Sequence, residues 1–149
     1  MKKYELTEET IKVGNLTLHR IKALKDFGNV KAGDLGGFIE DEKNLSHDVC
    51  AWVYDNAYVT GNAYVSENAE ISSDADYICI KGIGSVNRNT TFFKCSDGHI
   101  HVSCGCFSGT IPEFEEKVKE THGDSKFAKE YLAAVDVVKI HFDLERDSK

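Results

Sequence analysis

The chain has 149 residues, a formal net charge of −7 at pH 7, a hydrophobic content of 41% and a single proline. These values are typical of a folded protein and exclude a disordered one, and the length allows one domain or two small ones. No apolar run reaches the ~18–20 residues that cross a bilayer, and the Met-Lys-Lys start lacks the apolar segment of a signal peptide. Five cysteines, an odd number, favour a reducing compartment. We therefore expect a cytoplasmic protein without a membrane partner.

The negative charge is concentrated in one part of the chain. Residues 33–76 carry 10 acidic groups and 1 basic group, whereas residues 1–32 carry 4 acidic and 7 basic groups. An acidic surface repels phosphate backbones, so nucleic-acid binding through residues 33–76 is not expected. We interpret the charge as a solvated face, with docking to a basic partner as the alternative.

The first 32 residues are expected to form an N-terminal cap. Gly14-Asn15 is the residue pair of a tight turn, which predicts a hairpin of Thr10–Val13 and Leu16–Ile21. Repeat structures have open ends that terminal elements usually cover. We therefore interpret residues 1–32 as a hairpin that covers one end of the segment that follows.

The segment of residues 33–76 contains a hexapeptide repeat. Residues 51–75 read AWVYDN AYVTGN AYVSEN AEISSD A. The positions that recur are Ala51, Ala57, Ala63, Ala69 and Ala75, then Val53, Val59, Val65 and Ile71, then Asn56, Asn62, Asn68 and Asp74. Alanine and valine two positions apart share one face of an extended segment, and the turn-forming residues bend the chain every six residues. Such a chain can wind into stacked coils that bury the inward column.

The repeat is irregular between Gly33 and Cys50. Ile39 and Leu45 keep the six-residue spacing, but the step from Leu45 to Val53 is eight residues, which predicts a two-residue bulge. With this part included, residues 33–76 provide about two and a half coils.

The phased repeat resembles that of left-handed parallel β-helices, in which three hexapeptides make one triangular coil. Two stretches further resemble small phage- and prophage-encoded β-helix proteins, whose members are generally of uncharacterised function. These stretches are GDLGGFIEDEKNLSHDVCAWVYDN, residues 33–56, and VSCGCFSGTIPEFEEKVKETHGDSKFAKEYL, residues 102–132. The resemblance implies a left-handed β-helix, a phage context and a trimer.

After Asp76 the period of the sequence changes, and residues 77–149 are expected to form a small α+β domain. Tyr77–Ile83 and Thr90–Cys95 are predicted strands, and Asp97-Gly98 predicts a two-residue turn that joins the second strand to His99–Cys104. The complete expectation is a mainly β chain with an α+β C-terminal part. It consists of a short left-handed parallel β-helix, then a β-hairpin and two α-helices.

Two helices are predicted at the end of the chain. Thr110 and Glu113 form a capping-box pattern, and Gly123 ends the first helix. The second helix begins at Asp124 or Ser125. Its apolar positions keep a helical period and are Phe127, Tyr131, Ala134, Val135, Val138 and Phe142.

A group of cysteines and histidines follows the second predicted strand and suggests zinc ligands at first sight. The group is Cys95, His99, His101, Cys104 and Cys106. In the predicted register Cys95 pairs with Ile100 and Lys94 with His101, which places the thiols on the apolar face and the histidines opposite. The spacing also lacks the paired CxxC of a structural zinc site. We therefore expect buried, unreactive thiols, no metal site and no cofactor.

The polar face of the same hairpin predicts an anion site. Its members are Ser85, Arg88, Lys94, His99 and His101. Arginine and lysine supply charge-assisted donors, and the glycine-containing loop before residue 88 supplies backbone N–H groups. The alternative is an ordinary solvated face of a sheet.

A catalytic alternative comes from the β-helix resemblance, because many left-handed β-helix proteins are trimeric acyltransferases that use a histidine as general base. His47 is the histidine of residues 33–76, and Asp48 beside it is a candidate orienting carboxylate. Two and a half coils leave little length for a pantetheine groove, so an exposed turn residue is the competing interpretation.

Three large aromatic residues, Trp52, Tyr58 and Tyr64, directly precede the inward valines. They are predicted to point outward on different faces of a coil. Exposed aromatic residues often mark contacts, so we expect self-association through one or two of them.

The leading functional hypothesis is a non-enzymatic phage accessory protein that binds a host-cell ligand or protein. As an anti-defence factor it would sequester a nucleotide-like signal at the anion site or block a host immune protein with the acidic repeat. A hexapeptide-type acyltransferase and a small structural or assembly protein are the alternatives. The motifs GxGxxG, GxxxxGK[ST] and HExxH are absent from the sequence, which argues against the common chemistries that they serve.

Overall fold

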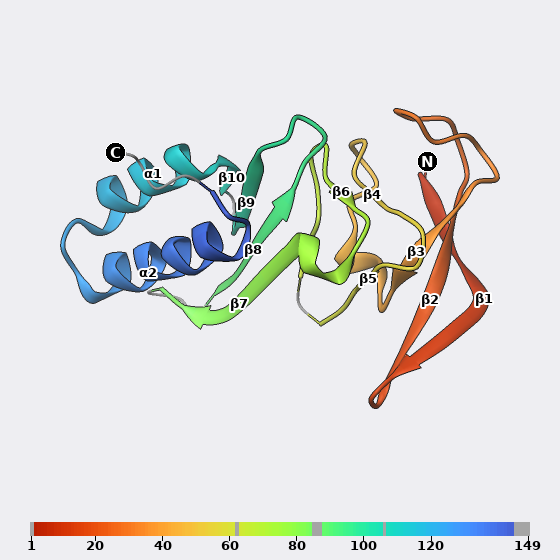
Figure 1. Ribbon diagram of the computed structural model, residues 1–149, viewed down its shortest axis with the longest axis horizontal. Coiled ribbons are helices and arrows are strands. Elements are labelled where there is room, and N and C mark those ends of the chain that lie inside the picture. The colour runs from red at the N-terminus through yellow and green to blue at the C-terminus, as the bar shows by residue number, and fades with distance from the viewer. Residues whose placement is uncertain (1, 62, 85–87, 106, 145–149) are drawn as a thin grey trace.

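A computed structural model of the protein describes residues 2–61, 63–84, 88–105 and 107–144. The N-terminal hairpin lies at one end of the molecule and the two helices lie at the other (Figure 1). The strands are β1 (Tyr4–Val13), β2 (Leu16–Ala23), β3 (Leu35–Ile39), β4 (Trp52–Val53), β5 (Tyr58–Val59), β6 (Glu70–Ile71), β7 (Tyr77–Ile83), β8 (Arg88–Lys94), β9 (Ile100–Cys104) and β10 (Phe107–Thr110). The helices are α1 (Ile111–His122) and α2 (Lys126–His141). The prediction of a mainly β chain that ends in two helices is confirmed.

The N-terminal hairpin is longer than predicted and joins the repeat edge to edge. Strands β1 and β2 are antiparallel, and Val13 pairs with Leu16 at the tip, where Gly14 has a φ of 61°. Strand β2 pairs antiparallel with β3, and β3 pairs parallel with β5, so the sheet order is β1-β2-β3-β5. The hairpin therefore extends a sheet to which two segments of residues 33–76 contribute.

The repeat pairs with itself at intervals of about three hexapeptides. Phe38 pairs with Tyr58 and Leu45 bridges to Val65, each twenty residues later, whereas Trp52 pairs with Glu70 eighteen residues later. The two pairs with the longer separation enclose the segment from Leu45 to Val53, and the pair with the shorter separation does not. The two extra residues therefore lie in this segment, and the predicted two-residue insertion is confirmed. Strands β3 and β5 belong to one sheet and strands β4 and β6 to another, and these sheets do not close on one another.

The inward column of the repeat is confirmed. Its buried members are Ala51, Val53, Ala57, Val59, Ala63, Val65, Ala69 and Ile71. Ala75, the last of the recurring alanines, is exposed. In the turns, the left-handed backbone conformation falls on Asp55, Gly61 and Glu67. These residues occupy the fifth position of successive units. Side chains at that position therefore lie at the corners of the repeat.

The C-terminal sheet is antiparallel with the order β10-β9-β8-β7. The predicted two-residue turn at Asp97-Gly98 is wrong, because the Cys95 N–H donates to the His99 carbonyl across a three-residue loop. Lys94 consequently pairs with Ile100, one residue away from the predicted register. Strand β10 was not predicted. It pairs antiparallel with β9, with Phe107 opposite Cys104.

The first helix begins and ends as the sequence predicts. The Thr110 hydroxyl accepts the Glu113 N–H, and the Glu113 carboxylate accepts the Thr110 N–H at 2.9 Å. Gly123 ends the helix with a φ of 57°. Hydrogen bonding at Thr110 holds the pKa of Glu113 below its usual range. Helix α2 begins after Ser125, whose side chain makes no cap hydrogen bond.

Strand β8 separates two hydrophobic cores. Phe93 and, just after the strand, Cys95 pack into the core of the repeat and the N-terminal cap. Phe92 packs into the core between the C-terminal sheet and the two helices, with Phe114 at 6.0 Å between ring centroids. Because side chains alternate along a strand, one strand serves both cores.

We predict that Phe93→Ala and Phe92→Ala each lower the free energy of unfolding by about 3–5 kcal/mol, because each leaves a cavity in a closed core. Urea denaturation followed by circular dichroism measures the loss. Leu35→Ala is the control, since Leu35 is 58% exposed and its truncation should change stability by at most about 0.5 kcal/mol. A phenylalanine variant as stable as this control would contradict the double-sided core.

Candidate functional site

The predicted anion site does not assemble among the residues that the structure describes. Ser85 lies outside them, and only the backbone of Arg88, the first residue of β8, is described. Phe93 pairs with His101 and Lys94 with Ile100, so Lys94 and His101 point to opposite faces of the sheet. His99 is exposed. The one-residue change in register is the physical reason for the separation.

His101 lies between two carboxylates instead of facing an anion. Its Nδ1 lies 2.6 Å from Glu67 Oε1 and its Nε2 lies 3.2 Å from Asp97 Oδ2. The Ser108 hydroxyl donates to the other oxygen of Glu67, and the imidazole stacks on Phe93. Hydrogen bonds from the His99 N–H and from His101 hold the pKa of Asp97 below its usual range. The network joins a corner of the repeat to the C-terminal sheet and repels anions.

The geometry of His47 is that of a structural residue. Its Nδ1 accepts the Lys3 N–H at 3.1 Å, so Nε2 carries the proton and donates to Glu42 Oε1 at 3.0 Å. The ring stacks on Tyr4 with 4.0 Å between centroids. Asp48 is not its orienting carboxylate, because Glu42 has that place. A general base needs a free lone pair, and here the lone pair accepts a backbone proton.

One of the three predicted interface aromatics is buried. Trp52 is 1% exposed, and Phe27 and Tyr4 cover it with edge-on contacts at 5.2 and 6.3 Å between ring centroids. The prediction that Trp52 points to solvent is wrong because N-terminal residues, distant in sequence, cover this face. Tyr58 is half-buried, whereas Tyr64 is 41% exposed.

The cysteines differ in their surroundings. Burial raises the pKa of the Cys95 thiol to about 12 and also raises the pKa of Cys79. Cys104 is half-buried and contacts the hydroxyls of Thr90 and Tyr131. Cys50 is exposed, and Cys106 lies outside the described residues. In the described part of the chain, no group of three or more His, Cys, Asp or Glu side chains could hold a metal ion.

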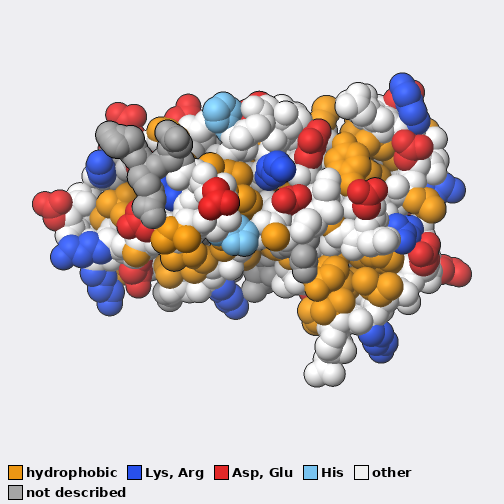
Figure 2. All heavy atoms as spheres, viewed as in Figure 1, with side chains coloured by type: hydrophobic (Ala, Val, Ile, Leu, Met, Phe, Trp, Pro, Cys, Tyr) orange, Lys and Arg blue, Asp and Glu red, His pale blue; other side chains and the backbone are white. Residues whose placement is uncertain are grey.

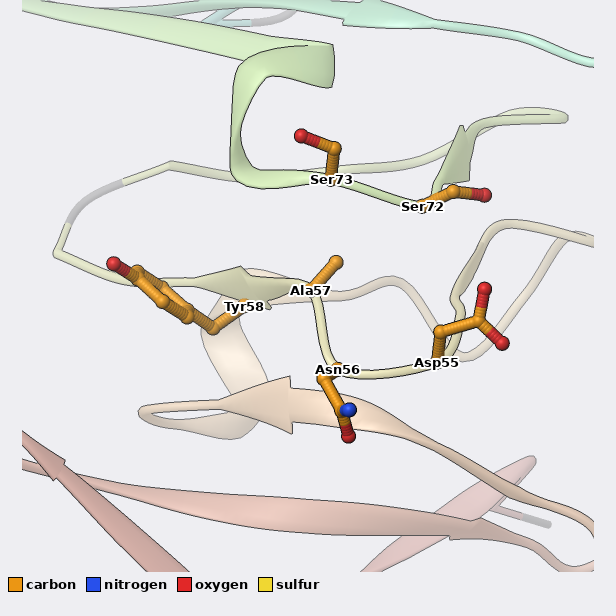
Figure 3. A pocket seen from close by; sticks show the side chains of 6 residues that line it. All are labelled: Asp55, Asn56, Ala57, Tyr58, Ser72 and Ser73. Carbon is orange, nitrogen blue, oxygen red and sulfur yellow. The ribbon is translucent and has the colours of Figure 1, made fainter.

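A first recess, which we call the corner recess, lies between residues 55–58 and residues 72–73 of the repeat (Figure 3). It has a volume of about 340 Å³ and is lined by Asp55, Asn56, Ala57, Tyr58, Ser72 and Ser73. Asn56 points away from it toward the N-terminal sheet, where its Oδ1 accepts a hydrogen bond from Arg20 at 3.1 Å. The carboxylate of Asp55 and the hydroxyl of Ser72 give the recess hydrogen-bond acceptors, whereas the Ser73 hydroxyl points away from Asp55 and accepts the Ala75 N–H at 3.1 Å.

A second recess, which we call the junction recess, lies where three parts of the chain meet. It has a volume of about 250 Å³ and is lined by Gly28, Asn29, Val30, Cys50, Tyr54, Asn68, Glu70 and Ser96. The first three come from the loop between β2 and β3, the next four from the repeat, and Ser96 from the loop between β8 and β9. No local sequence pattern indicates this recess, because its walls are far apart along the chain.

A buried lysine supports the wall of the junction recess. Lys3 is 1% exposed, and its ammonium donates to the carbonyls of Val49 and Ala51 at 2.8 and 2.6 Å, on either side of Cys50. The same group lies 4.7 Å from the centre of the Phe27 ring. Burial lowers the pKa of Lys3 from 10.5 to about 8.

Comparison with protein-family models and with curated proteins found no match to this chain. In the described residues, neither helix is long and apolar enough to cross a membrane.

We predict that Lys3 makes stability rise with pH between about 8 and 10.5. Below this range the amine is protonated in both the folded and the unfolded chain. Within it the folded chain loses the proton first, so the unfolded chain binds more protons and folding becomes more favourable by up to about 3 kcal/mol. Urea denaturation of the wild type and of Lys3→Met at several pH values isolates this contribution. A constant difference between the two proteins would contradict it.

Proposed function

We propose that this protein is a non-enzymatic accessory protein that binds a basic segment of a partner protein through its acidic repeat. The observation that carries the proposal is the corner recess. It combines the exposed carboxylate of Asp55 with the exposed hydroxyl of Ser72, on a part of the chain with 10 acidic groups and 1 basic group. Lysine and arginine side chains bind such acceptors through charge-assisted hydrogen bonds.

Most of the acidic residues of the repeat already have partners within the chain. Those whose side chains accept hydrogen bonds are Asp34, Glu40, Asp41, Glu42, Glu67 and Asp76. Asp48, Asp55 and Glu70 have no side-chain hydrogen bond or salt bridge to another described residue. Figure 2 shows acidic side chains scattered over one face rather than gathered into a single field. Recognition would therefore depend on a local site such as Asp55.

A basic side chain next to the corner recess, Arg20, already has several partners. Arg20 donates to the carbonyls of Gly36 and Asp55, bonds the side chain of Asn56 and forms a salt bridge with Glu9 at 3.0 Å. Its guanidinium also stacks on Phe38 at 4.3 Å. Arg20 thus fixes the wall of the recess, and its bonds to described residues go to groups other than the Asp55 carboxylate.

The biological context is proposed from the resemblance of residues 33–56 and 102–132. We place the protein in a phage or prophage, acting in the host cytoplasm, with its repeat as a short left-handed β-helix. Parallel pairing at intervals of eighteen to twenty residues supports coils of three hexapeptides. Blocking a host immune protein fits an acidic docking site. Sequestering a nucleotide-like signal has less support, because His101 faces carboxylates.

The two alternatives make different demands on the structure. An acyltransferase would need His47 as a base, and both of its ring nitrogens are engaged within the chain. A purely structural or assembly role would need no recess, and it becomes the preferred interpretation if no basic ligand binds.

We predict that Asp55→Asn weakens binding of a tetra-arginine peptide about tenfold, because one charge-assisted hydrogen bond is lost. Fluorescence anisotropy of a labelled peptide at fixed ionic strength measures the affinity. Glu8→Gln is the matched control, since Glu8 is exposed on β1 and the change in net charge is the same. Equal losses in both variants would show that only bulk charge attracts the peptide, and the proposed site would be rejected.

We further propose a homotrimer in which Tyr64 lies at the contact, in place of the buried Trp52. Multi-angle light scattering at micromolar concentration should give three chains for the wild type and a smaller species for Tyr64→Ser. Leu35→Ser removes an exposed apolar side chain of the N-terminal sheet and should leave the mass unchanged. A monomeric wild type would exclude the trimer.

A further inference from the structure

We infer that the junction recess is a binding site for a small molecule that carries a primary ammonium group, with Glu70 as its counter-ion. This site lies apart from the corner recess, because the two share no lining residue. Binding of an amine at the junction recess therefore does not depend on the proposed docking of a basic protein segment at the corner recess.

Hydrogen bonds hold the walls of the junction recess in place. Phe27 and Val30 exchange backbone hydrogen bonds at 2.9 and 2.7 Å and close the loop that forms the first wall. The Ser96 N–H donates to the Asn68 carbonyl at 2.8 Å and fixes the loop between β8 and β9 against the repeat. The Lys3 ammonium holds the carbonyls on either side of Cys50. A preformed recess lowers the entropic cost of binding.

The charge of the recess is unbalanced. Glu70 is the one charged residue in its lining, and its half-buried side chain has no hydrogen bond or salt bridge to another described residue. The other polar lining groups are neutral: the Asn29 and Asn68 amides, the Ser96 hydroxyl and the Tyr54 phenol. A half-buried carboxylate without a partner is stabilised by a cation. The ring of Tyr54 adds an aromatic surface, which also favours ammonium groups.

The protonation of Tyr54 fits this role. Burial and the neighbouring Glu70 raise the pKa of the phenol. The hydroxyl therefore keeps its proton at neutral pH and can donate to an acceptor on the ligand. The amides and the Ser96 hydroxyl can bind further polar groups, so the fitting ligand combines an amine with a hydroxyl, carbonyl or carboxylate.

The volume limits the size of the ligand. Sites for drug-sized molecules usually measure about 300–1,000 Å³, and this recess measures about 250 Å³. A small amine fits within it, whereas a dinucleotide does not. The lining also has no basic side chain that would receive a phosphate.

Cys50 provides a readout at the site, because it is an exposed thiol in the lining. The test measures iodoacetamide alkylation of Cys50 in the full chain by peptide mass spectrometry, with butylamine or its uncharged isostere butanol present. Butylamine should slow the alkylation of Cys50 in proportion to occupancy, whereas butanol should not. Cys79 and Cys95, which do not line the recess, report any effect on the whole protein.

Variants separate this site from the corner recess. Glu70→Gln should bind butylamine about tenfold more weakly, so the butylamine concentration that half-protects its Cys50, relative to the variant's own alkylation rate without ligand, should rise about tenfold. Asp55→Asn should keep the protection. Asn29→Phe is a second variant for the case in which Glu70→Gln does not fold. Asn29 lies at an exposed loop position, and the larger side chain should fill the recess and abolish the protection of Cys50.

Three results would each overturn the inference. One is the absence of protection by butylamine at saturating concentrations, and another is equal protection by butanol. The third is half-protection of folded Glu70→Gln at the same butylamine concentration as the wild type. Loss of peptide binding in Asp55→Asn has no bearing on these outcomes, so the two sites can fail separately.

Discussion

The burial of both faces of strand β8 is the constraint on which the two halves of the molecule depend. Phe92 and Phe93 are adjacent in sequence and enter different cores. A slip of one residue would exchange the two faces and turn the exposed Lys94 toward the core that holds Phe93, which costs free energy because a charge loses its water. The register is therefore fixed by side-chain chemistry. It also decides that His101 meets Glu67 and that Ser96 reaches the junction recess.

Polar groups with several partners join the parts of the chain around these cores. Arg20 binds the N-terminal hairpin to the repeat, Lys3 and His47 bind the first residues to the irregular segment, and His101 binds the repeat to the C-terminal sheet. Each of these groups is at least partly removed from water, so an unmatched partner would be costly. In these contacts Arg20 and Lys3, which support the walls of the two recesses, donate to backbone carbonyls.

Features with a local cause could be predicted from the sequence. The inward column of the repeat, the two-residue insertion and the capping box at Thr110 follow from spacing alone, and the structure has all three. Features with a distant cause could not. Burial of Trp52 depends on Tyr4 and Phe27, and an Asp-Gly pair does not reveal whether two or three residues form the loop. Because the loop has three residues, Lys94 and His101 of the predicted anion site lie on opposite faces of the sheet.

The two recesses favour cations for the same physical reason and differ in the size of cation that they admit. In each, a carboxylate has no side-chain partner among the described residues, while a basic group that supports the wall, Arg20 or Lys3, is held by carbonyls and an aromatic ring. Asp55 is exposed at a corner, where a side chain of another protein can reach it. Glu70 lies half-buried between three segments, where only a small molecule fits. Because β8 sets the position of Ser96, occupancy of the junction recess would also stabilise the contact between the repeat and the C-terminal sheet.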